Sequence, residues 1–511
     1  VKDGRRPGRF VNMTDSVRGA RYGAENNKND SIRNILAVEL LNTLVSAVNN
    51  VLWSYVLIVM LVGLGLWFSF RTGFVQIRHL REMVRLVAEG ATAKTKKGHI
   101  STFQAFCVST ASRVGVGNIA GIAIAVVVGG PGAVFWMWVI ALLGAATGFV
   151  ESTLAQIYKV PRRGGGFVGG PAYYIGNALG SRWGAWLFAV LISVTYGLIF
   201  NSVQANTMAL SLKASFDVDP AWTGLGIAVL TGLVIFGGLN RIARVVGWMV
   251  PLMAGAYLLL AAVVTVMNIT LVPEVLLLIV KSAFGVDAVT GAAFGMALMT
   301  GIKRGLFSNE AGMGSVPNAA ATADASHPVK QGLVQALGVF VDTMFVCTAS
   351  AMIVLLSPDW HGAQLTGIEL TQHVLTGQLG AWTNTFMTVI VLFFAFSSII
   401  GNYFYGEVNM DFISRRPIAS WIFRGCVLVM VYFGSVASLN IVWNLADLFM
   451  ALMAMLNLAA IALLGRYAFA AMKDYFKQRS EGVENPEFDP SVLPATRGIV
   501  CWPRKKDEEV N

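Results

Sequence analysis

The sequence predicts an all-α protein that crosses a membrane about eleven times. Of its 511 residues, 55% are hydrophobic and only 13% are charged, which is too apolar for a soluble globular domain. Apolar runs long enough to cross a bilayer as helices recur along most of the chain. Two of these runs contain glycine-rich interruptions, as expected where a helix opens at membrane depth. Composition and repeated runs together indicate a polytopic membrane protein.

The apolar runs define the predicted helices in order. Residues 1–34 are polar and basic and carry no cleavable signal pattern, so the first run is expected to remain as a helix. The eleven predicted helices cover residues 52–70, 103–128, 133–157, 185–211, 221–238, 244–268, 288–314, 331–356, 382–403, 420–437 and 443–465.

Two predicted helices are interrupted at corresponding positions. The sequence GVGNIAG at Gly115–Gly121 interrupts the second helix, and GLFSNEAGMG at Gly305–Gly314 interrupts the seventh. Helices two to six and seven to eleven therefore form two sets of five, which suggests an inverted repeat. Unwound backbone persists in hydrocarbon only where protein, water or a ligand satisfies it. The pair of interruptions is typical of a secondary transporter with its binding site at the breaks.

This pattern divides the chain into five segments. The two repeats are expected at 103–268 and 288–466, preceded by the first helix and a basic loop at 51–102. Residues 1–50 are interpreted as a tail that could include an interfacial helix, and 467–511 as a partly disordered tail in the cytoplasm.

The distribution of Lys and Arg predicts the orientation in the membrane. Alternate loops and the C-terminal tail hold most of these residues, whereas the opposite loops hold only Lys213 and Lys281. Because basic loops tend to stay in the cytoplasm, the side with more Lys and Arg is assigned to the cytoplasm. The N-terminus is then expected outside the cytoplasmic membrane, and the C-terminus in the cytoplasm. The net charge of +10 is explained by loops facing anionic lipid, so no nucleic-acid partner is expected.

The cysteines and histidines indicate neither a disulfide nor a metal site. The four cysteines are scattered without CxxC spacing, and all five histidines fall in predicted loops. No histidine lies in a predicted helix to act as a base for Ser308 or Ser397, which argues against a membrane-embedded hydrolase. A cation channel would need a continuous polar pore, and the paired interruptions fit an occluded site better.

The segment Gly129–Gly144 (GGPGAVFWMWVIALLG) resembles the signature of the alanine or glycine:cation symporters. The resemblance covers about residues 45–470 and implies a LeuT-type fold, with helices two to eleven as the core and helix one added. It implies sodium-coupled uptake of a small neutral amino acid, alanine or glycine, by alternating access. Further segments similar to the family are Gly73–Arg78, Gly115–Gly121, Gly169–Tyr174, Arg304–Gly312 and Phe340–Thr343.

The two interruptions supply the candidate substrate site. Half-helix N-termini suit a carboxylate, and half-helix C-terminal carbonyls suit an ammonium group. Gln204, which with Asn206 resembles the family's Gln-x-Asn, is a candidate pocket wall, although buried amides also bond helices together. For the glycines, tight helix packing is the alternative. The carboxylate is expected at Asn118, Ile119, Ala120 and Gly121, and the ammonium at Phe307, Ser308 and Asn309, with Gly312 in the same interruption.

Resemblance to sodium-coupled proteins of this fold implies two Na⁺ sites. The first would use the side chains of Asn118 and Ser308 with a carbonyl near Arg113. The second would use Ser397 and Ser398 with the carbonyls of Ala111 and Val114, unless the two serines only bond the preceding turn. The co-transported Na⁺ is the only cofactor expected, and the substrate and the lipid bilayer are the only partners.

Ionisable residues within the predicted helices leave further alternatives open. Each is costly at membrane depth and needs a role. A proton-coupled symporter would use Glu310 or Asp342 as the proton carrier, and Arg113 is a plausible neighbour of Glu310. Glu151, Lys303 and Arg424 are interpreted instead as residues near the interfaces that extend towards water. The sequence leaves the oligomeric state open.

Overall fold

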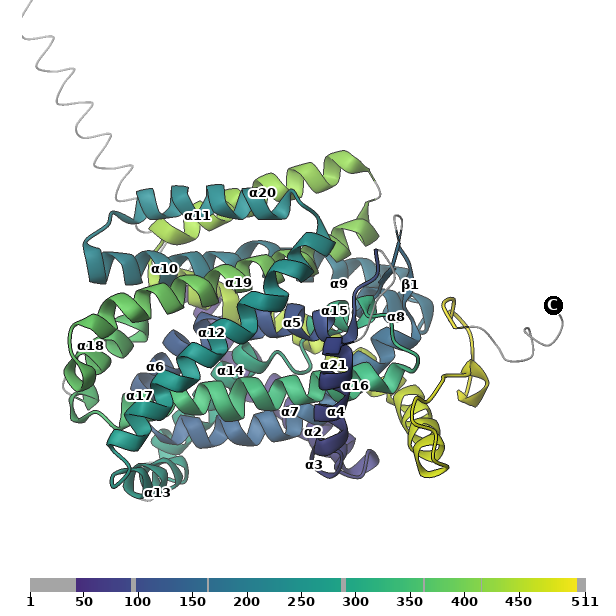
Figure 1. Ribbon diagram of the computed structural model, residues 1–511, viewed down its shortest axis with the longest axis horizontal. Coiled ribbons are helices and arrows are strands. Elements are labelled where there is room, and N and C mark those ends of the chain that lie inside the picture. Colours follow the sequence, from purple (N-terminus) through teal and green to yellow (C-terminus); the bar gives the residue numbers. More distant parts are fainter. Residues whose placement is uncertain are drawn as a thin grey trace, which may run out of the picture.

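The computed structural model describes residues 43–92, 98–162, 165–285, 291–361, 364–414 and 416–502, and these are almost entirely helical (Figure 1). Nine of the described helices are long and apolar enough to cross a membrane, and Pro220–Ile235 is a shorter apolar helix. The predicted all-α, multi-pass fold is confirmed. Most of the predicted N-terminal tail, with its interfacial helix, falls on residues 1–42 and lies outside the described residues.

The first span is one continuous helix from Thr43 to Arg71, which includes the π-helical turn η1 (Leu52–Leu57) and α2 (Ile58–Arg71). Two helices that the sequence reading left unassigned follow it, α3 (Val75–Arg78) and α4 (Leu80–Thr92). α4 is amphipathic, burying Met83 and Leu86 against the bundle. The basic loop between the first two spans is therefore folded against the bundle along α4.

The first interrupted helix consists of α5 (Thr102–Arg113) and α6 (Val116–Gly129). α5 begins with a capping box, in which the Ser101 hydroxyl accepts from the Gln104 N–H and the Gln104 side chain accepts from the Ser101 N–H. The helix stops at Val114, whose backbone is no longer helical. Only glycine fits at position 115, because a Cβ there would lie 2.2 Å from Ser398 Oγ.

The elements between the two interrupted helices include one short strand pair. Strands β1 (Val160–Pro161) and β2 (Phe167–Val168) are antiparallel. The helices of this part are α7 (Gly132–Ile157), α8 (Pro171–Asn177), α9 (Arg182–Val194), the π-helical η2 (Thr195–Phe200), α10 (Asn201–Phe216), α11 (Pro220–Ile235), α12 (Leu239–Met267) and α13 (Val272–Ala283).

The second interrupted helix consists of α14 (Gly291–Asn309) and α15 (Val316–Thr322). Glu310, Gly312 and Gly314 between them have positive φ values of 57°, 88° and 80°, so the chain is fully unwound there. The elements that follow are α16 (Pro328–Val339), the π-helical η3 (Phe340–Cys347), α17 (Thr348–Leu355), η4 (Pro358–His361), α18 (Gly367–Leu379), α19 (Trp382–Ile413), α20 (Pro417–Val436), α21 (Leu439–Ser480) and η5 (Pro490–Val492).

The interrupted helices lie between two groups of intact helices (Figure 1). α10, α11, α19 and α20 pack together on one side. α7 packs against α14 and α16 on the other side. α5 contacts α19, and α6 contacts α14, so both interruptions fall near the middle of the molecule.

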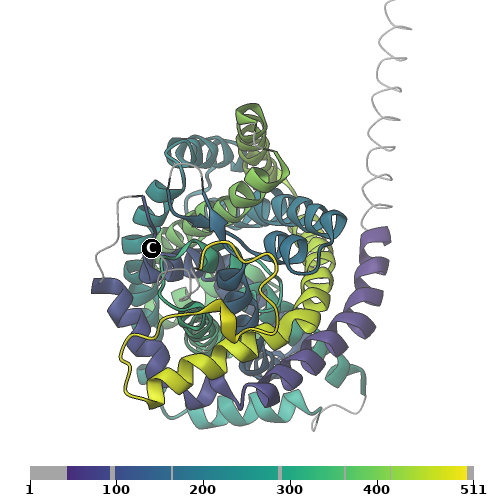
Figure 2. The same cartoon turned by 90° about the vertical axis from the view of Figure 1, so that its right-hand side faces the viewer.

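The C-terminal segment is folded onto the bundle, although its composition favoured partial disorder. α21 continues to Ser480, and the chain then crosses the end of the bundle near β1 and α8 (Figure 2). Phe488 donates its N–H to the Ser326 carbonyl at 3.1 Å. Trp502 Nε1 donates to the Gln156 carbonyl at 3.0 Å. Specific backbone contacts therefore hold residues that sequence composition alone assigns to a tail.

Lys159 fastens this segment to the second interrupted helix. Its ammonium lies 4.1 Å from the ring centre of Phe167 and 4.5 Å from that of Trp502, and it donates to the Ala323 carbonyl at 3.2 Å beyond the end of α15. Burial between these groups lowers the pKa of Lys159 to about 8. The ammonium thus bonds the Ala323 carbonyl, which also accepts from Gln156 Nε2 at 2.9 Å, while the two rings shield the ammonium from water.

Replacing Trp502 with alanine is expected to loosen this end of the molecule. The change removes a cation–π contact and a hydrogen bond, together worth about 2 kcal/mol. Trp502→Ala should therefore lower the thermal midpoint of the purified protein, measured by the light scattering and intrinsic fluorescence of a detergent solution. Trp183→Ala, at a side chain that is 73% exposed, is the matched control. An equal shift in both variants would show that the Trp502 contacts contribute nothing.

Candidate functional site

The two interruptions meet at a cluster of polar side chains in the centre of the molecule. Asn118 Nδ2, from the first turn of α6, lies 3.0 Å from Ser308 Oγ and 2.6 Å from Asp342 Oδ1. Ser308 donates to the other carboxylate oxygen of Asp342, and Thr343 Oγ1 donates to the same oxygen at 2.9 Å. All four side chains are fully buried. A carboxylate, an amide and two hydroxyls from three helices therefore share one buried site.

Asp342 belongs to η3, where the helix widens into a π-helical turn. Such turns are uncommon and often occur at functional sites. Here the turn places Asp342 and Thr343 at the junction of α6 and α14. Among the described residues, no Lys, Arg or His nitrogen lies within 4.0 Å of the Asp342 carboxylate. A buried carboxylate without a positive partner is costly, so the cluster is suited to a bound cation.

Gln204, on α10, bonds the backbone of the first interruption. Its Oε1 accepts the Val116 N–H at 3.2 Å, and Asn118 Oδ1 accepts the Gly115 N–H at 3.1 Å. These two N–H groups start the half-helix α6, and the Gly115 N–H is shared with the Arg113 carbonyl at 2.9 Å. Side-chain oxygens thus occupy positions that a ligand carboxylate oxygen would also fit.

A second group of oxygens lies where α19 crosses the first interruption. Ser398 Oγ donates to the Ala111 carbonyl in the last turn of α5 at 2.8 Å. Val114 is buried at the break itself. Ser397, in contrast, donates to the Phe394 carbonyl of its own helix at 2.8 Å and contacts Met253 Sδ at 3.5 Å. Of the two predicted serines, Ser398 therefore reaches the carbonyl at the end of α5. The Ser397 hydroxyl instead bonds its own helix and contacts α12.

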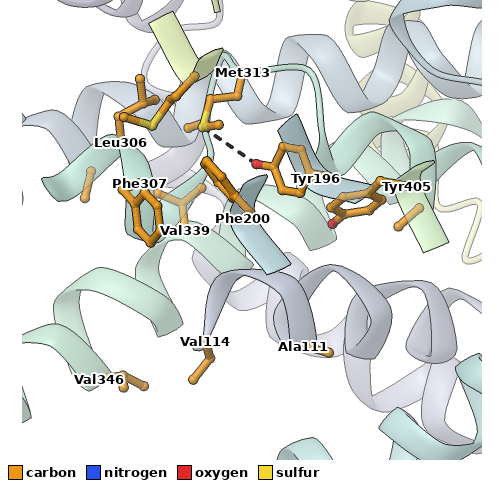
Figure 3. Packing of buried hydrophobic residues seen from close by; sticks show 14 of the residues in the cluster. Ala111, Val114, Tyr196, Phe200, Leu306, Phe307, Met313, Val339, Val346 and Tyr405 are labelled. Carbon is orange, nitrogen blue, oxygen red and sulfur yellow. Dashed lines mark hydrogen bonds between the residues drawn. The ribbon is translucent and has the colours of Figure 1, made fainter. Parts of the chain in front are cut away.

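Aromatic rings pack beside α6 near the polar cluster. The ring of Phe307 lies 4.7 Å from that of Phe200 and 4.7 Å from that of Trp443, and Figure 3 shows Phe307 next to Phe200. A Cβ at Gly117 would come within 2.6 Å of Phe307, and one at Gly121 would lie 3.5 Å from Trp443. These glycines let the rings approach α6 closely.

Phe200, Phe307 and Trp443 form an aromatic wall beside α6. Sequence reasoning missed Phe200 and Trp443 as parts of this wall. Phe200 precedes Gln204 by four residues and therefore shares its helix face, which is a signal that the sequence contains. Trp443 is placed by the packing of α21, which no local pattern reveals. The Trp443 Nε1 atom is buried and has no hydrogen-bond partner within the described part of the chain, so it can donate to a ligand.

The remaining predicted substrate residues lie at different distances from the cluster. Ile119 and Ala120 are buried on α6 directly after Asn118. Asn309 Oδ1 accepts the Ala311 N–H at 3.1 Å, which turns the chain out of α14. Gly312 lies on the far side of the interruption, where a Cβ would be 2.9 Å from Leu458 and 3.3 Å from Thr147. The Arg113 carbonyl accepts the Gly115 N–H at 2.9 Å.

Glu151 on α7 holds the unwound backbone of the second interruption. Its two carboxylate oxygens accept the N–H groups of Gly312 and Gly314 at 3.1 and 3.2 Å. Asn457 on α21 donates to the same carboxylate at 2.8 Å. Glu151 is fully buried, so the interpretation of this residue as an interfacial side chain is wrong. The reason is that three free donors at the break outweigh the cost of burying its charge.

Lys303 and Arg424 also have partners inside the protein. Lys303 and its neighbour Arg304 both pair with Asp447, the lysine at 3.9 Å. The Arg304 guanidinium lies 4.5 Å from the ring centre of Trp443. Arg424 pairs with Glu407 at 2.9 Å. The Lys303 side chain is 14% exposed, and the Arg424 side chain is 15% exposed.

Comparison with known proteins now identifies the family. The sequence profile of the sodium:alanine symporter family matches residues 38–490. The chain belongs to this family. This symporter is 50% identical over 465 residues to a probable sodium/glutamine symporter of Bacillus subtilis, covering 91% of this chain and 97% of the relative. It is 36% identical over 457 residues to a sodium/alanine symporter of Methanococcus maripaludis, covering 87% and 99%.

A solved structure agrees with the fold. A manganese transporter of Eremococcus coleocola superimposes with a TM-score of 0.51 at 15% identity, covering 76% of this chain and 86% of that one. At this identity the likeness concerns the fold alone, which is the LeuT-type arrangement. Family and fold together make this symporter a multi-pass membrane transporter and not an enzyme.

Glu151 provides a test of the second interruption. Glu151→Gln replaces one acceptor oxygen with an N–H₂ group facing backbone donors, which should cost about 1–3 kcal/mol. We expect a lower thermal midpoint and weaker ligand binding, measured on purified protein by fluorescence and calorimetry. Glu274→Gln, at an exposed residue of α13, should change neither. If Glu151→Gln matches wild type in both measurements, the carboxylate does not hold the break.

Proposed function

We propose that this protein takes up a small neutral amino acid, alanine or glycine, together with Na⁺ across the cytoplasmic membrane. The observation that carries the proposal is the buried Asp342 carboxylate, surrounded by Asn118, Ser308 and Thr343 between two interrupted helices. Hard cations prefer such oxygen ligands, and Asp342 lacks a positive partner in the described chain. Midplane sites between interrupted helices are where transporters of this architecture bind substrate and ion.

The first Na⁺ site therefore gains two ligands that the sequence-based set lacked. We assign Asp342 and Thr343 to it, beside Asn118 and Ser308. The Arg113 carbonyl and Asn118 Oδ1 both accept the Gly115 N–H, so the Asp342 carboxylate and the hydroxyls of Ser308 and Thr343 are the oxygens assigned to the ion, and Asn118 Nδ2 positions Asp342. The second Na⁺ site is assigned to Ser398 with the carbonyls of Ala111 and Val114.

The substrate is assigned to the space between Gln204 and the aromatic wall. A carboxylate oxygen would replace Gln204 Oε1 at the Val116 N–H, as the first interruption offers half-helix donors there. The side chain would face Phe307 and Trp443, which stand close to Gly117 and Gly121. Because both rings lie this close to α6, the site favours alanine or glycine over a longer side chain.

Alternating access follows from this placement. α14 and α15 pack with α7, and α6 packs with α14, whereas α10, α19 and α20 form the opposite group, which α5 contacts through α19. Rocking of the two groups about the site would open it to one side at a time. We assign the end that carries β1, α8 and the C-terminal segment to the cytoplasm, because basic loops concentrate there.

The ion is tested by removing the Asp342 charge. Asp342→Asn keeps the shape but takes away the negative ligand, and we expect sodium affinity to fall at least about tenfold. The measurement is calorimetric binding of L-alanine, D-alanine, glycine and L-glutamine to purified protein at several NaCl concentrations, with choline chloride as the sodium-free reference. Asp217→Asn, at an exposed residue, is the control. Wild-type binding that is equal in choline would refute sodium coupling.

Substrate size is tested at Trp443. Trp443→Leu replaces the large ring next to Gly121 with a smaller side chain. The kcat/KM for L-glutamine uptake, divided by that for L-alanine, should therefore rise about tenfold. Uptake of both labelled amino acids into proteoliposomes measures the ratio, and Trp382→Leu, at a 57% exposed residue, serves as the matched variant. An unchanged ratio would show that Trp443 does not contact the substrate.

A further inference from the structure

Residues 485–502, here called the strap, are fixed near both ends to helices next to the second interruption. Near its start, Ser326 Oγ, between α15 and α16, donates to the Pro486 carbonyl at 2.8 Å, and the Phe488 N–H donates to the Ser326 carbonyl at 3.1 Å. At its end, Trp502 Nε1 donates to a backbone carbonyl of α7 at 3.0 Å. α15 and α16 both pack against α7, so the two anchors of the strap belong to one group of helices.

Between these anchors the strap reaches the other group of helices. Gly498 packs on the backbone of Asn177, the last residue of α8, and a Cβ at position 498 would lie 2.5 Å from the Asn177 carbonyl oxygen. The φ of Gly498 is 80°, which also favours glycine. α8 packs on α9, and α9 packs on α19. The strap therefore connects the two groups at the end of the molecule that faces the viewer in Figure 2.

The start of α5 is attached to the same anchor. Ile100, just before α5, forms a parallel backbone bridge with Ala323 beyond the end of α15. The Asp324 N–H donates to the Ile100 carbonyl at 3.0 Å, and Asp324 is followed closely by Ser326, which holds the strap. α5 also packs on α19. A movement of α5 away from α19 would therefore pull on the junction of α15 and α16, and with it on the strap.

We propose that the strap fastens the cytoplasmic end of the protein: it stays on α8 while α5 packs on α19, and Gly498 leaves Asn177 when α5 moves away. The inference rests on the proposed function, because this separation is part of alternating access. The two anchors are made by hydrogen bonds and by the contact of Trp502 with Lys159, whereas Gly498 packs against backbone. The contact with α8 is therefore the one that separates, and the strap remains attached to α7 and α16.

The second sodium site determines when the strap is released. That site is assigned to Ser398 on α19 and to the carbonyls of Ala111 and Val114 at the end of α5, so a bound ion holds α5 on α19. Sodium should therefore keep the strap on α8, and removal of sodium should free the strap. By linkage, a substitution that frees the strap must weaken sodium binding, although it lies far from the sodium ligands in the sequence.

Cys501 reports the state of the strap in the full-length protein. Its thiol is half-buried, and burial raises the pKa of the thiol, which slows its reaction with a maleimide. Cys107 and Cys347 are buried, and the exposed Cys426 is removed by Cys426→Ser. We expect Cys501 to react at least about threefold more slowly in NaCl than in choline chloride. Equal rates in a protein that binds sodium would overturn the proposal.

Gly498→Ala tests the contact with α8, and Gly482→Ala is the matched control. Both glycines have a positive φ, at 80° and 88°, so alanine meets similar backbone strain at each position. A Cβ at position 482 has no atom within 4 Å, whereas one at position 498 meets Asn177. In NaCl, Gly498→Ala should speed the labelling of Cys501 at least about fivefold. It should also weaken the binding of radioactive sodium to purified protein at least about threefold. Gly482→Ala should match wild type in both measurements.

The strap is only a structural segment if Gly498→Ala binds sodium as wild type does, or labels no faster than Gly482→Ala, and either result would overturn the proposal. If Gly498→Ala does not fold, the sodium dependence of labelling in the wild-type strap decides. Wild type that binds neither sodium nor an amino acid would refute the proposed function. The labelling of the two glycine variants would then still decide whether Gly498 holds the strap on α8.

Discussion

Peptide groups in the middle of a membrane have to find partners inside the protein, and at the second interruption the partner is the carboxylate of Glu151. It accepts two backbone N–H groups from the unwound chain and one amide hydrogen from Asn457. Without these bonds, residues 310–315 would have a strong tendency to continue the helix of α14. A continuous helix would remove the turn that brings Ser308 and Phe307 to α6.

The first interruption follows the same rule with neutral side chains. Gln204 and Asn118 accept the N–H groups that begin α6, and Ser398 donates to a carbonyl that ends α5. At each break the partners come mainly from helices that stay intact. The intact helices α7, α10 and α19 thus fix the shape of backbone that belongs to other elements.

Local sequence was sufficient to locate both breaks and several groups that meet there. Glycine spacing marked the two unwound segments, and Gln204 and Ser398 reach the first of them. The roles of Asp342 and Glu151 needed the structure, because a lone carboxylate in an apolar run has the same local pattern whether it faces an ion, a backbone donor or water. Trp443 depends on how α21 crosses α14, which spacing along one helix does not encode.

The fold of the C-terminal segment also could not be predicted from local sequence. Its prolines and mixed charges favour disorder, and a few residues such as Phe488 and Trp502 are enough to dock it. Their partners lie far back in the chain, with 346 residues separating Trp502 from Gln156. During synthesis, Lys159 and the end of α15 stay uncovered until residue 502 has emerged from the ribosome. The last described residues to be made are thus the ones that complete the packing around some of the early helices, and a nascent chain stalled before them would present an unfinished face.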